Sequence, residues 1–334
     1  MKSRALVLRE LIARPQGVSV PGITVPLDAY IAELIGLLAG YGGGFAQAGQ
    51  DGKPDRGFIS RDGMIGRARR IVSATSLPIL FDIDDGYGDA LIARDTVREL
   101  LETVPNLAAF HIEDQRFPKR CGHIAGKDVL PLDEFLGKLD AVLDMREKLG
   151  RKDVSVVART DAFSAASGKK DKKLGGDIRE VVKRLCAYKK LGADVGWAET
   201  PDPRYKVAEE IALRVRDKFP DFPLAYNVSP SFSHEDWERW ADETSDERLN
   251  DLGYKLRFIT YFSLVVQVWA VESFMRVFKD LGATRTLREI KRIVKGTLAE
   301  NIMKLVGVPE ALELERRFIP GSGKKQKHSE GFGA

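Results

Sequence analysis

The chain has 334 residues, of which 43% are hydrophobic and 31% charged, and its formal net charge at pH 7 is +4. This composition is typical of a globular protein, and so small a net charge does not favour nucleic-acid binding. The most apolar run, 258–274, is interrupted by Gln267 and Glu272 and falls short of the about 20 apolar residues that span a membrane. With two cysteines and no secretory signal segment, the chain is expected in the cytoplasm.

Stretches with the apolar period of a helix alternate along the chain with stretches typical of strands. We expect helices at 2–13, 28–39, 64–75, 90–103, 132–149, 176–191, 205–219 and 235–241. We expect strands at 18–25, 45–48, 77–84, 107–113, 154–160, 195–199, 222–227 and 254–260. This alternation predicts an α/β fold, a single (β/α)8 barrel of the TIM type, and an open doubly wound sheet is less favoured because no GxGxxG turn is present.

Two further helical patterns, 263–281 and 286–305, follow the last expected strand. They are more apolar than one barrel needs to cover itself, so we expect a homo-oligomer, most simply a tetramer, in which these helices pack against or exchange between neighbouring copies. The barrel and these helices are expected to form one domain over 1–320. The lysine-rich stretch 164–176 is expected to be a solvated insertion or a contact for an anionic partner, and the tail 321–334 to be disordered.

Carboxylates follow two neighbouring strands of the expected barrel. Asp82 and Asp84 end one strand and Glu113 ends the next. In a barrel of this kind the active site forms where the strands end, and crowded carboxylates repel one another unless a cation lies among them. Oxygen ligands favour Mg²⁺ or Mn²⁺, and Asp55 could join through water. The alternative is that some of these residues cap helices and that Asp55 is an ordinary turn residue.

A charged loop follows Glu113 within the stretch 110–131, FHIEDQRFPKRCGHIAGKDVLP. Cys121 lies there among cationic or potentially cationic groups, including Lys119 and His123, and such surroundings lower the pKa of a thiol from its usual value of about 8.5. Gly122 adds the backbone freedom that a closing loop needs. The alternative is a solvated basic loop in which the cysteine has no role.

Arg159 follows a run of apolar residues and is expected to be nearly buried. A buried guanidinium needs an anionic partner, and a substrate carboxylate can accept two hydrogen bonds from its fork. The alternative is a structural ion pair with Asp161 or Glu199.

A second group of polar residues follows the strand that ends near Asn227. The amide of Asn227 and the hydroxyls of Ser229 and Ser231 could bind a second carboxylate, although such a cluster can also be an ordinary turn. His111 and His123 could donate hydrogen bonds to substrate, and the alternative for His111 is a histidine satisfied within the core.

These motifs carry a resemblance to a known family. HIEDQ followed by KRCGH, a Gly-Lys and a Leu-Pro resembles the isocitrate lyase and phosphoenolpyruvate mutase superfamily, whose lyase branch carries a Lys-Lys/Arg-Cys-Gly-His loop. PILFDIDDGYG, VVARTDA, WAET and LAYNVSPSF are similar to further segments of that family. The resemblance runs from about residue 54 to about residue 260, which is most of the expected barrel.

The resemblance implies a magnesium-dependent enzyme and assigns roles to particular residues. It implies metal ligands at Asp82, Asp84, Asp55 and Glu113, a substrate arginine at Arg159, a dicarboxylate pocket at Glu199, Asn227, Ser229, Ser231 and Thr260, and an acid/base role for Cys121. We add His123 and Glu199 as catalytic residues, and His111 and Gly122 as substrate-binding residues. Where the family has a Tyr-x-Ser-Gly-Trp stretch for the glyoxylate carboxylate, a gap-free placement gives Ala46, Gln47, Ala48, Gly49 and Gln50, of which Ala48, Gly49 and Gln50 are expected to bind substrate.

The expected activity is magnesium-dependent cleavage of a carbon–carbon bond in a 2-hydroxy di- or tricarboxylate. Isocitrate giving succinate and glyoxylate is the first expectation, and 2-methylisocitrate is the next. A hydrolase or mutase of the same superfamily, acting on oxaloacetate or a phosphonate, is the rival among enzymes, and the Cys-Gly-His loop argues against the phosphonate branch. A catalytically silent barrel that serves as a binding module is the rival of another class, suggested by Ala46 and Ala48.

Overall fold

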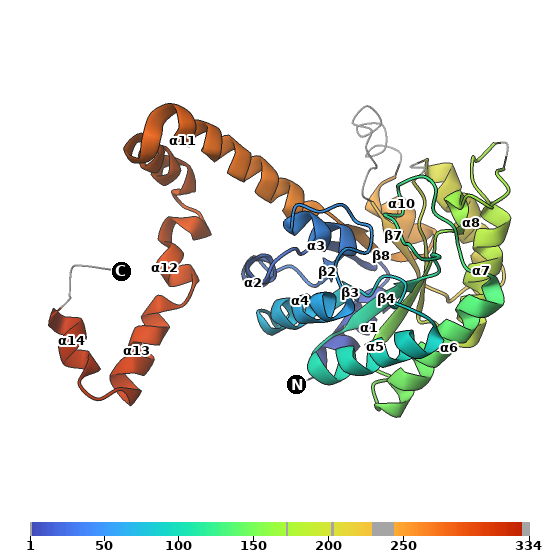
Figure 1. The fold of residues 1–334 in the computed structure, drawn as a ribbon, viewed down its shortest axis with the longest axis horizontal. Helices are drawn as coiled ribbons and strands as arrows, with labels where there is room; N and C mark the ends of the chain where they lie inside the picture. The colour runs from blue at the N-terminus through green and yellow to red at the C-terminus, as the bar shows by residue number, and fades with distance from the viewer. Residues whose placement is uncertain (1, 172, 202–203, 229–243, 329–334) are drawn as a thin grey trace. The chain divides into compact units, whose positions relative to one another are not determined.

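The computed structural model describes residues 2–171, 173–201, 204–228 and 244–328. Within them, parallel strands form one eight-stranded sheet in the order β1-β8-β7-β6-β5-β4-β3-β2 (Figure 1). The strands are β1 Val18–Pro21, β2 Gly40–Gly42, β3 Ile79–Asp82, β4 Ala109–Glu113, β5 Ser155–Thr160, β6 Val195–Ala198, β7 Leu224–Asn227 and β8 Tyr254–Ile259. A parallel bridge between Gly22 and Tyr41 joins the two ends of this order. The sheet is therefore a nearly closed barrel, and the predicted (β/α)8 fold is confirmed.

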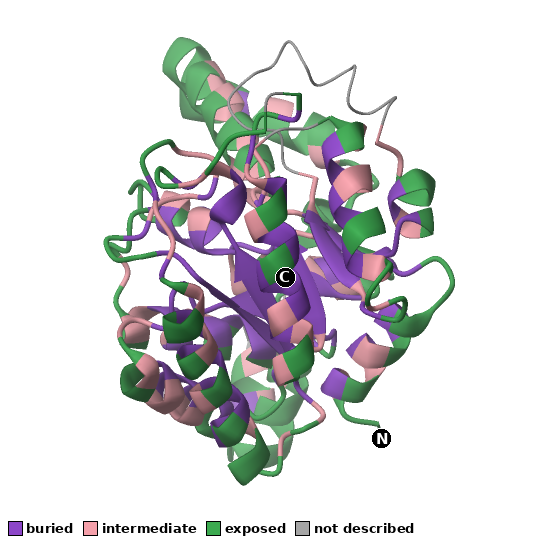
Figure 2. Cartoon of the chain, turned by 90° about the vertical axis from the view of Figure 1, so that its right-hand side faces the viewer, coloured by how far each residue is buried: buried purple, intermediate pink, exposed green. Residues whose placement is uncertain are grey.

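Helices surround the barrel, and all of those named here except α1, which precedes β1, lie between successive strands (Figure 1). They are α1 Arg4–Ala13, α2 Pro26–Leu34, α3 Gly44–Gln50, α4 Arg61–Ser73, α5 Ala90–Thr103, α6 Leu132–Lys148, α7 Ile178–Leu191, α8 Tyr205–Arg216 and α10 Asp246–Asp251. The central strands are buried along their whole length, whereas the helices bury one face and expose the other (Figure 2). This division follows from the sequence, because strands covered on both sides consist of continuous apolar runs and the helices are amphipathic.

Helix ends follow local sequence signals. Asp89 precedes α5, and its carboxylate accepts hydrogen bonds from the backbone N–H groups of Leu91 and Ile92. Asp177 caps α7 in the same way through the N–H of Glu180, and α7 ends at Gly192, whose φ of 117° suits glycine. The two aspartate caps fix where α5 and α7 begin at the active-site end of the barrel.

The strand predicted at 45–48 is wrong. The second strand is β2, five residues earlier than that range begins, and 44–50 forms helix α3. The glycines of β2 have a low strand propensity, so the sequence does not indicate a strand here. Close packing nevertheless requires glycine in this strand. A Cβ atom added to Gly42 would lie 2.4 Å from Cδ2 of Phe81 on β3. The short helix predicted at 235–241 lies outside the described residues.

The chain folds into two compact units, 1–266 and 267–334. Helix α11, Phe262–Val294, is interrupted at Gly282, where φ is 69°, and the second unit continues with the 3-10 turn Leu298–Asn301 and the helices α12 Ile302–Leu305, α13 Val308–Phe318 and α14 Ser322–His328. Helix α14 lies within the stretch predicted to be a disordered tail.

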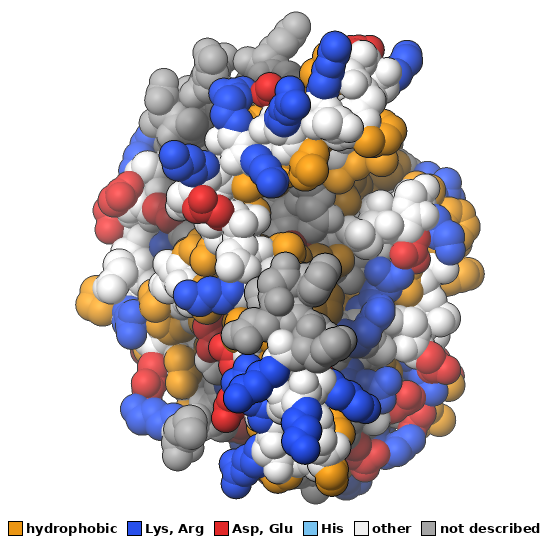
Figure 3. Space-filling view, turned by 90° about the vertical axis from the view of Figure 1, so that its left-hand side faces the viewer, with side chains coloured by type: hydrophobic (Ala, Val, Ile, Leu, Met, Phe, Trp, Pro, Cys, Tyr) orange, Lys and Arg blue, Asp and Glu red, His pale blue; other side chains and the backbone are white. Residues whose placement is uncertain are grey.

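Large apolar side chains remain exposed on the helices of the second unit, among them Trp269, Met275, Phe278 and Phe318. On the face drawn in Figure 3, hydrophobic side chains reach the surface among many Lys and Arg side chains. None of the helices in the described part of the chain has the length and apolar content to cross a membrane. Exchange of these helices between copies of the chain stays a prediction.

Candidate active site

The carboxylates of Asp82 and Asp84 converge at the end of β3. Asp82 accepts hydrogen bonds from the backbone N–H of Gly44 at 2.7 Å and from that of Asp84 at 2.8 Å. A Cβ atom added to Gly44 would lie 2.8 Å from Oδ2 of Asp82 and 3.2 Å from Oδ1 of Asp84, so the two carboxylates flank one point that only a glycine leaves free. The Tyr87 hydroxyl donates to Oδ2 of Asp84 at 3.1 Å. The predicted convergence of these two carboxylates is present.

Lys119 supplies the positive charge among these carboxylates. Its Nζ lies 2.7 Å from Oδ1 of Asp55 and also forms an ion pair with Asp84, and its side chain is buried. Burial raises the pKa of Asp84 to about 7, and the charge of Asp82 adds to the rise. Burial alone would lower the pKa of Lys119, but Asp55 and Asp84 hold it well above its ordinary value. Sequence reasoning missed this role, because the pairing of a loop lysine depends on the fold.

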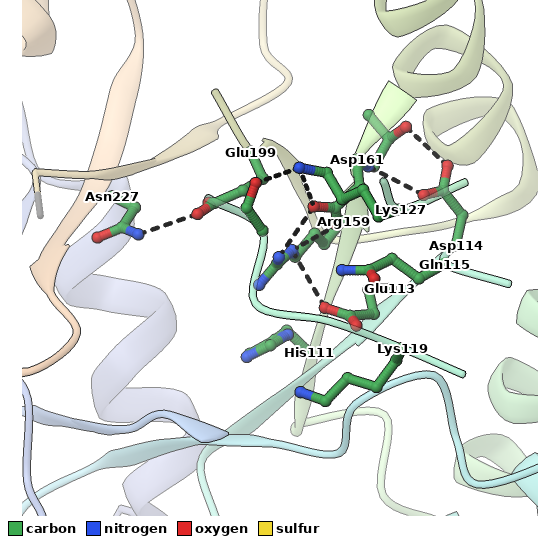
Figure 4. Close-up of polar contacts among 12 residues, drawn as sticks. His111, Glu113, Asp114, Gln115, Lys119, Lys127, Arg159, Asp161, Glu199 and Asn227 are labelled. Atoms are coloured by element: carbon green, nitrogen blue, oxygen red, sulfur yellow. Dashed lines mark hydrogen bonds and ion pairs between the residues drawn. The ribbon is translucent and has the colours of Figure 1, made fainter. Parts of the chain in front are cut away.

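Arg159, on β5, is paired within the chain (Figure 4). Its guanidinium donates to both carboxylate oxygens of Asp161, at 2.9 and 3.1 Å, and Nε lies 3.3 Å from Oε2 of Glu113. The guanidinium also lies 4.5 Å from the ring centroid of Trp197. The ion pair with Asp161 that the sequence left as an alternative is therefore formed, and a substrate carboxylate would have to share or displace it.

A buried network holds Asp161 in place behind Arg159 (Figure 4). Asp114 accepts a hydrogen bond from the backbone N–H of Asp161 at 2.9 Å and from the Thr160 hydroxyl at 2.6 Å. It also accepts from Arg184 at 3.0 Å and from the Tyr188 hydroxyl at 2.7 Å. Asp114 follows Glu113 directly in the sequence, but in a strand neighbouring side chains point to opposite faces, so it supports the site from outside the barrel.

His123, Glu199 and Asn227 contact one another and form a second part of the candidate site. Nε2 of His123 lies 2.7 Å from Oε1 of Glu199, and the Asn227 amide donates to the same oxygen at 3.2 Å. The Thr260 hydroxyl donates to Oδ1 of Asn227 at 3.2 Å. Burial acts to raise the pKa of Glu199, but Arg159 and His123 outweigh it and lower that pKa to about 2. These residues, chosen from three strand ends and one loop, are brought together as predicted.

The predicted thiolate character of Cys121 is wrong. Burial raises the pKa of the Cys121 thiol to about 12, and the charge of Asp55 adds to the rise. The neighbouring cations do not offset this, because Lys119 pairs with Asp55 and Asp84, and Arg120 donates to the backbone carbonyl of Ala125 at 3.0 Å. Cys121 is thus a protonated thiol at neutral pH, which suits a proton donor better than a nucleophile.

At Gly122, the loop that carries Cys121 lies directly against Arg159 and Glu199. A Cβ atom added to Gly122 would lie 2.4 Å from Nη2 of Arg159 and 2.4 Å from Cγ of Glu199. The buried Lys127 ammonium donates a hydrogen bond to the Gly122 carbonyl, which holds this arrangement. Only glycine permits the loop to close as it does here.

Replacing Gly122 by Ala should reduce kcat/KM by at least about tenfold, because displacing catalytic groups by about 1 Å costs up to about 10²-fold. The added methyl group would push the loop away from Arg159 and Glu199. Steady-state kinetics would measure the loss. Gly137→Ala on α6 is the matched control, since a Cβ atom there meets nothing within 4 Å, and it should leave kcat/KM unchanged. Equal activity of the two variants would contradict the closed loop as the active arrangement.

His111 lies in the barrel interior rather than in an open pocket. It is 0% exposed, and its Nε2 lies 2.9 Å from the Tyr41 hydroxyl and 3.2 Å from Oδ1 of Asp82. Its ring meets the ring of Trp197 edge to face, at 4.8 Å between centroids. His111 is therefore buried in the core and supports Asp82 through Nε2, but its Nδ1 has no hydrogen-bond partner among the described residues, so it is not fully satisfied there and its role toward substrate stays a prediction.

The remaining predicted substrate residues lie elsewhere. Ala48, Gly49 and Gln50 belong to α3, where Gly49 lies against Leu264 and Gln50 is exposed. The glycines that do contact the carboxylates and Thr260 come earlier, at 43–44, because β2 ends before them. Ser229 and Ser231 lie outside the described residues.

Carboxylate oxygens are the ligands that a divalent cation prefers, but Asp82, Asp84 and Glu113 are not arranged in the structure as a complete set of metal ligands. Within 2–171, 173–201, 204–228 and 244–328, no three His, Cys, Asp or Glu side chains are grouped as metal ligands. Oε1 of Glu113 is buried with no hydrogen-bond partner, and burial raises the pKa of Glu113 well above its ordinary value. A buried, unpartnered carboxylate oxygen whose pKa is also raised by the charge of Asp82 is an environment that a hard cation stabilises.

Comparisons with known proteins show the family of this chain. The family model described as phosphoenolpyruvate phosphomutase matches residues 8–267. The chain is 35% identical to isocitrate lyase of Haloferax volcanii over 98% of this chain and 91% of that protein, and 32% identical to 2-methylisocitrate lyase of Bacillus subtilis over 83% and 82%. The crystal structure of a 2,3-dimethylmalate lyase superposes with a TM-score of 0.75 at 26% identity, covering 95% of this chain and 96% of that one. The chain therefore belongs to the phosphoenolpyruvate mutase and isocitrate lyase superfamily of lyases and related enzymes.

Proposed function

We propose that this chain is a metal-dependent lyase that cleaves a carbon–carbon bond of a 2-hydroxy di- or tricarboxylate, with isocitrate, giving succinate and glyoxylate, as the first substrate to test. The observation that carries the proposal is the position of the Lys-Arg-Cys-Gly-His loop. Its Gly122 lies against Arg159 and Glu199, and its Lys119 lies among the carboxylates of Asp55 and Asp84. One loop therefore contacts both the acidic cluster and the residues that are suited to bind the carboxylates of a substrate.

Arg159, His123 and Asn227 are suited to bind the carboxylates of the substrate. In the structure, Asp161 accepts hydrogen bonds from Arg159, and Glu199 accepts one from Asn227 and forms an ion pair with His123. A substrate carboxylate can take over part of this role, because a guanidinium offers five N–H donors in a planar fork. These donors then face the negative charge that develops on the departing dicarboxylate.

Asp82, Asp84 and Glu113, with Asp55, would hold a Mg²⁺ or Mn²⁺ ion, and enzymes of the superfamily use a divalent metal. When bound there, the ion supplies Lewis-acid polarisation of the substrate hydroxyl and of the 2-oxoacid product. The Lys119 ammonium already pairs with Asp55 and Asp84. The ammonium and the metal are therefore expected to compete for the same carboxylates.

Cys121 is suited to deliver the final proton. When the carbon–carbon bond breaks, its electron pair stays on the carbon beside the departing carboxylate, and that carbon must be protonated to give succinate. A thiol whose pKa is raised to about 12 keeps its proton at neutral pH until a strongly basic carbon faces it. The sulfur then carries the negative charge until it is protonated again from solvent.

The proposal is tested by supplying the purified protein with Mg²⁺ and isocitrate and trapping glyoxylate as its phenylhydrazone. Glyoxylate release that stops with EDTA is the expected result. A second candidate is 2-methylisocitrate, favoured by the similarity to 2-methylisocitrate lyases, and its product pyruvate is trapped in the same assay. Oxaloacetate tests the hydrolase alternative. Intact Mg²⁺ binding without release of a 2-oxoacid from either lyase substrate, and without hydrolysis of oxaloacetate, would instead favour a silent binding module.

We further propose that the enzyme works in the cytoplasm as a homo-oligomer, most simply a tetramer. The large apolar side chains exposed on α11 and α13 support an assembly, because exposed apolar surface can mark interaction sites. Gel filtration with light scattering measures the assembly, and a monomer at micromolar concentration would contradict it.

A further inference from the structure

A second cleft lies outside the candidate active site. It has a volume of about 960 Å³ and lies between the start of α7, the stretch 165–171 that precedes it, and the segment 128–131. None of Asp82, Glu113, Cys121, Arg159 and Glu199 lines it. Its size is that of a pocket for a small molecule.

Four cations on this cleft form no ion pair within the described residues. They are Arg116, Lys169, Lys170 and Arg179, and all four line the cleft and are exposed. The two other cations differ, since Arg184 pairs with Asp114 and Glu180, and Arg214 pairs with Glu210. We call the four residues Arg116, Lys169, Lys170 and Arg179 the basic cleft.

The acids on the same cleft are already engaged by backbone N–H groups, by a hydroxyl or by other cations. Asp177 accepts from the N–H groups of Glu180 and Lys169, at 3.1 and 2.8 Å. Asp171 accepts from two backbone N–H groups, at 2.8 and 2.9 Å, and Glu180 pairs with Arg184 at 2.9 Å. Asp128 accepts from the Ser167 hydroxyl at 2.5 Å. The acids therefore stabilise the loop and the helix start, and they leave the donors of the four cations available to a ligand.

We propose that the basic cleft binds a small phosphate-bearing metabolite. A phosphate dianion needs two or more positive charges and several N–H donors, and the four side chains supply both from three segments of the chain. For the lysine-rich stretch 164–176, the sequence allowed either a solvated insertion or a contact for an anionic partner. In this proposal it is the anion contact. The site does not depend on the proposed lyase activity.

The test is isothermal titration calorimetry of the full chain with inorganic phosphate and, separately, with AMP, at constant ionic strength and without phosphate buffer. Both probes should bind the wild-type protein, and the double variant Lys170→Glu/Arg179→Glu should bind each at least tenfold more weakly. The matched control is Arg69→Glu/Arg70→Glu, which changes the net charge equally on exposed positions of α4. It should change either Kd by no more than about twofold, because exposed charges farther apart than about 10 Å are screened.

Tighter binding of AMP than of phosphate would identify a nucleotide-like ligand, and equal binding would identify the free anion. Absence of heat with both probes at millimolar concentration would overturn the proposal, as would equal weakening by the two double variants. Circular dichroism confirms that the variants fold. Loss of phosphate binding in Arg159→Lys together with its retention in Lys170→Glu/Arg179→Glu would place the anion in the active site and likewise overturn the proposal.

Discussion

Replacing Lys119 by Met should lower the free energy of unfolding of the metal-free protein by about 3–5 kcal/mol, because removing one partner of a buried ion pair leaves an uncompensated charge. The Lys119 ammonium contacts the carboxylates of Asp55 and Asp84, and all three side chains are buried. Methionine keeps the unbranched apolar stem and removes only the charge and its hydrogen bonds. Urea denaturation in EDTA, followed by circular dichroism, gives the change.

Added Mg²⁺ should recover more stability in Lys119→Met than in the wild-type protein, since in the variant the ion faces no competing ammonium. Lys138→Met is the matched control. Lys138 is a buried lysine whose Nζ donates to the backbone carbonyl of Asp85 at 2.9 Å, so its loss removes a hydrogen bond but no carboxylate pairing. That variant should respond to Mg²⁺ as the wild type does. A Lys119→Met protein as stable as wild type in EDTA would show that Lys119 is not the counter-charge of this cluster.

The strand ends of this barrel could be predicted from the sequence because topology alone brings them together. Alternation of strands and helices fixes a parallel barrel, and in such a barrel polar residues that follow apolar strands share one rim. Asp82, Asp84, Arg159, Glu199 and Asn227 were identified in this way, and the structure places all of them around one site. The partners of Arg159 could not be chosen from sequence, since Asp161 and a substrate carboxylate offer the guanidinium the same chemistry.

The loop chemistry could not be predicted, because it depends on the direction in which each side chain points. Counting cations near Cys121 gave the wrong sign for its pKa shift, since Lys119 turns toward Asp55 and Asp84. The second strand was missed for a different reason. Its glycines carry no hydrophobic signal, and they are required by the close approach of Phe81 at Gly42, which is a tertiary contact.

Replacing Cys121 by Ser should reduce kcat by about 10²- to 10⁴-fold, the range that a positioned general acid contributes. Serine has a similar size, but its hydroxyl is a much weaker acid than a thiol, so protonation of the product carbon should become slow. Mg²⁺ binding should not change, because serine keeps the backbone hydrogen bond from residue 121 to the Asp55 carbonyl, at 3.0 Å, and brings no charge to the carboxylate cluster. Turnover is measured by glyoxylate release, and Mg²⁺ affinity by thermal shift.

Cys186→Ser is the matched control for that variant, because Cys186 is a buried cysteine on α7 that does not line the active site. It should keep wild-type turnover. A raised thiol pKa also predicts that Cys121 in the ligand-free enzyme reacts more slowly with iodoacetamide at pH 7 than a free thiol of pKa about 8.5, since only the thiolate attacks. Wild-type turnover in Cys121→Ser would exclude the proton-donor role. Rapid alkylation of Cys121 would show instead that the sulfur is a thiolate before substrate binds, and then the proton delivered to the product carbon must come from another group of the site.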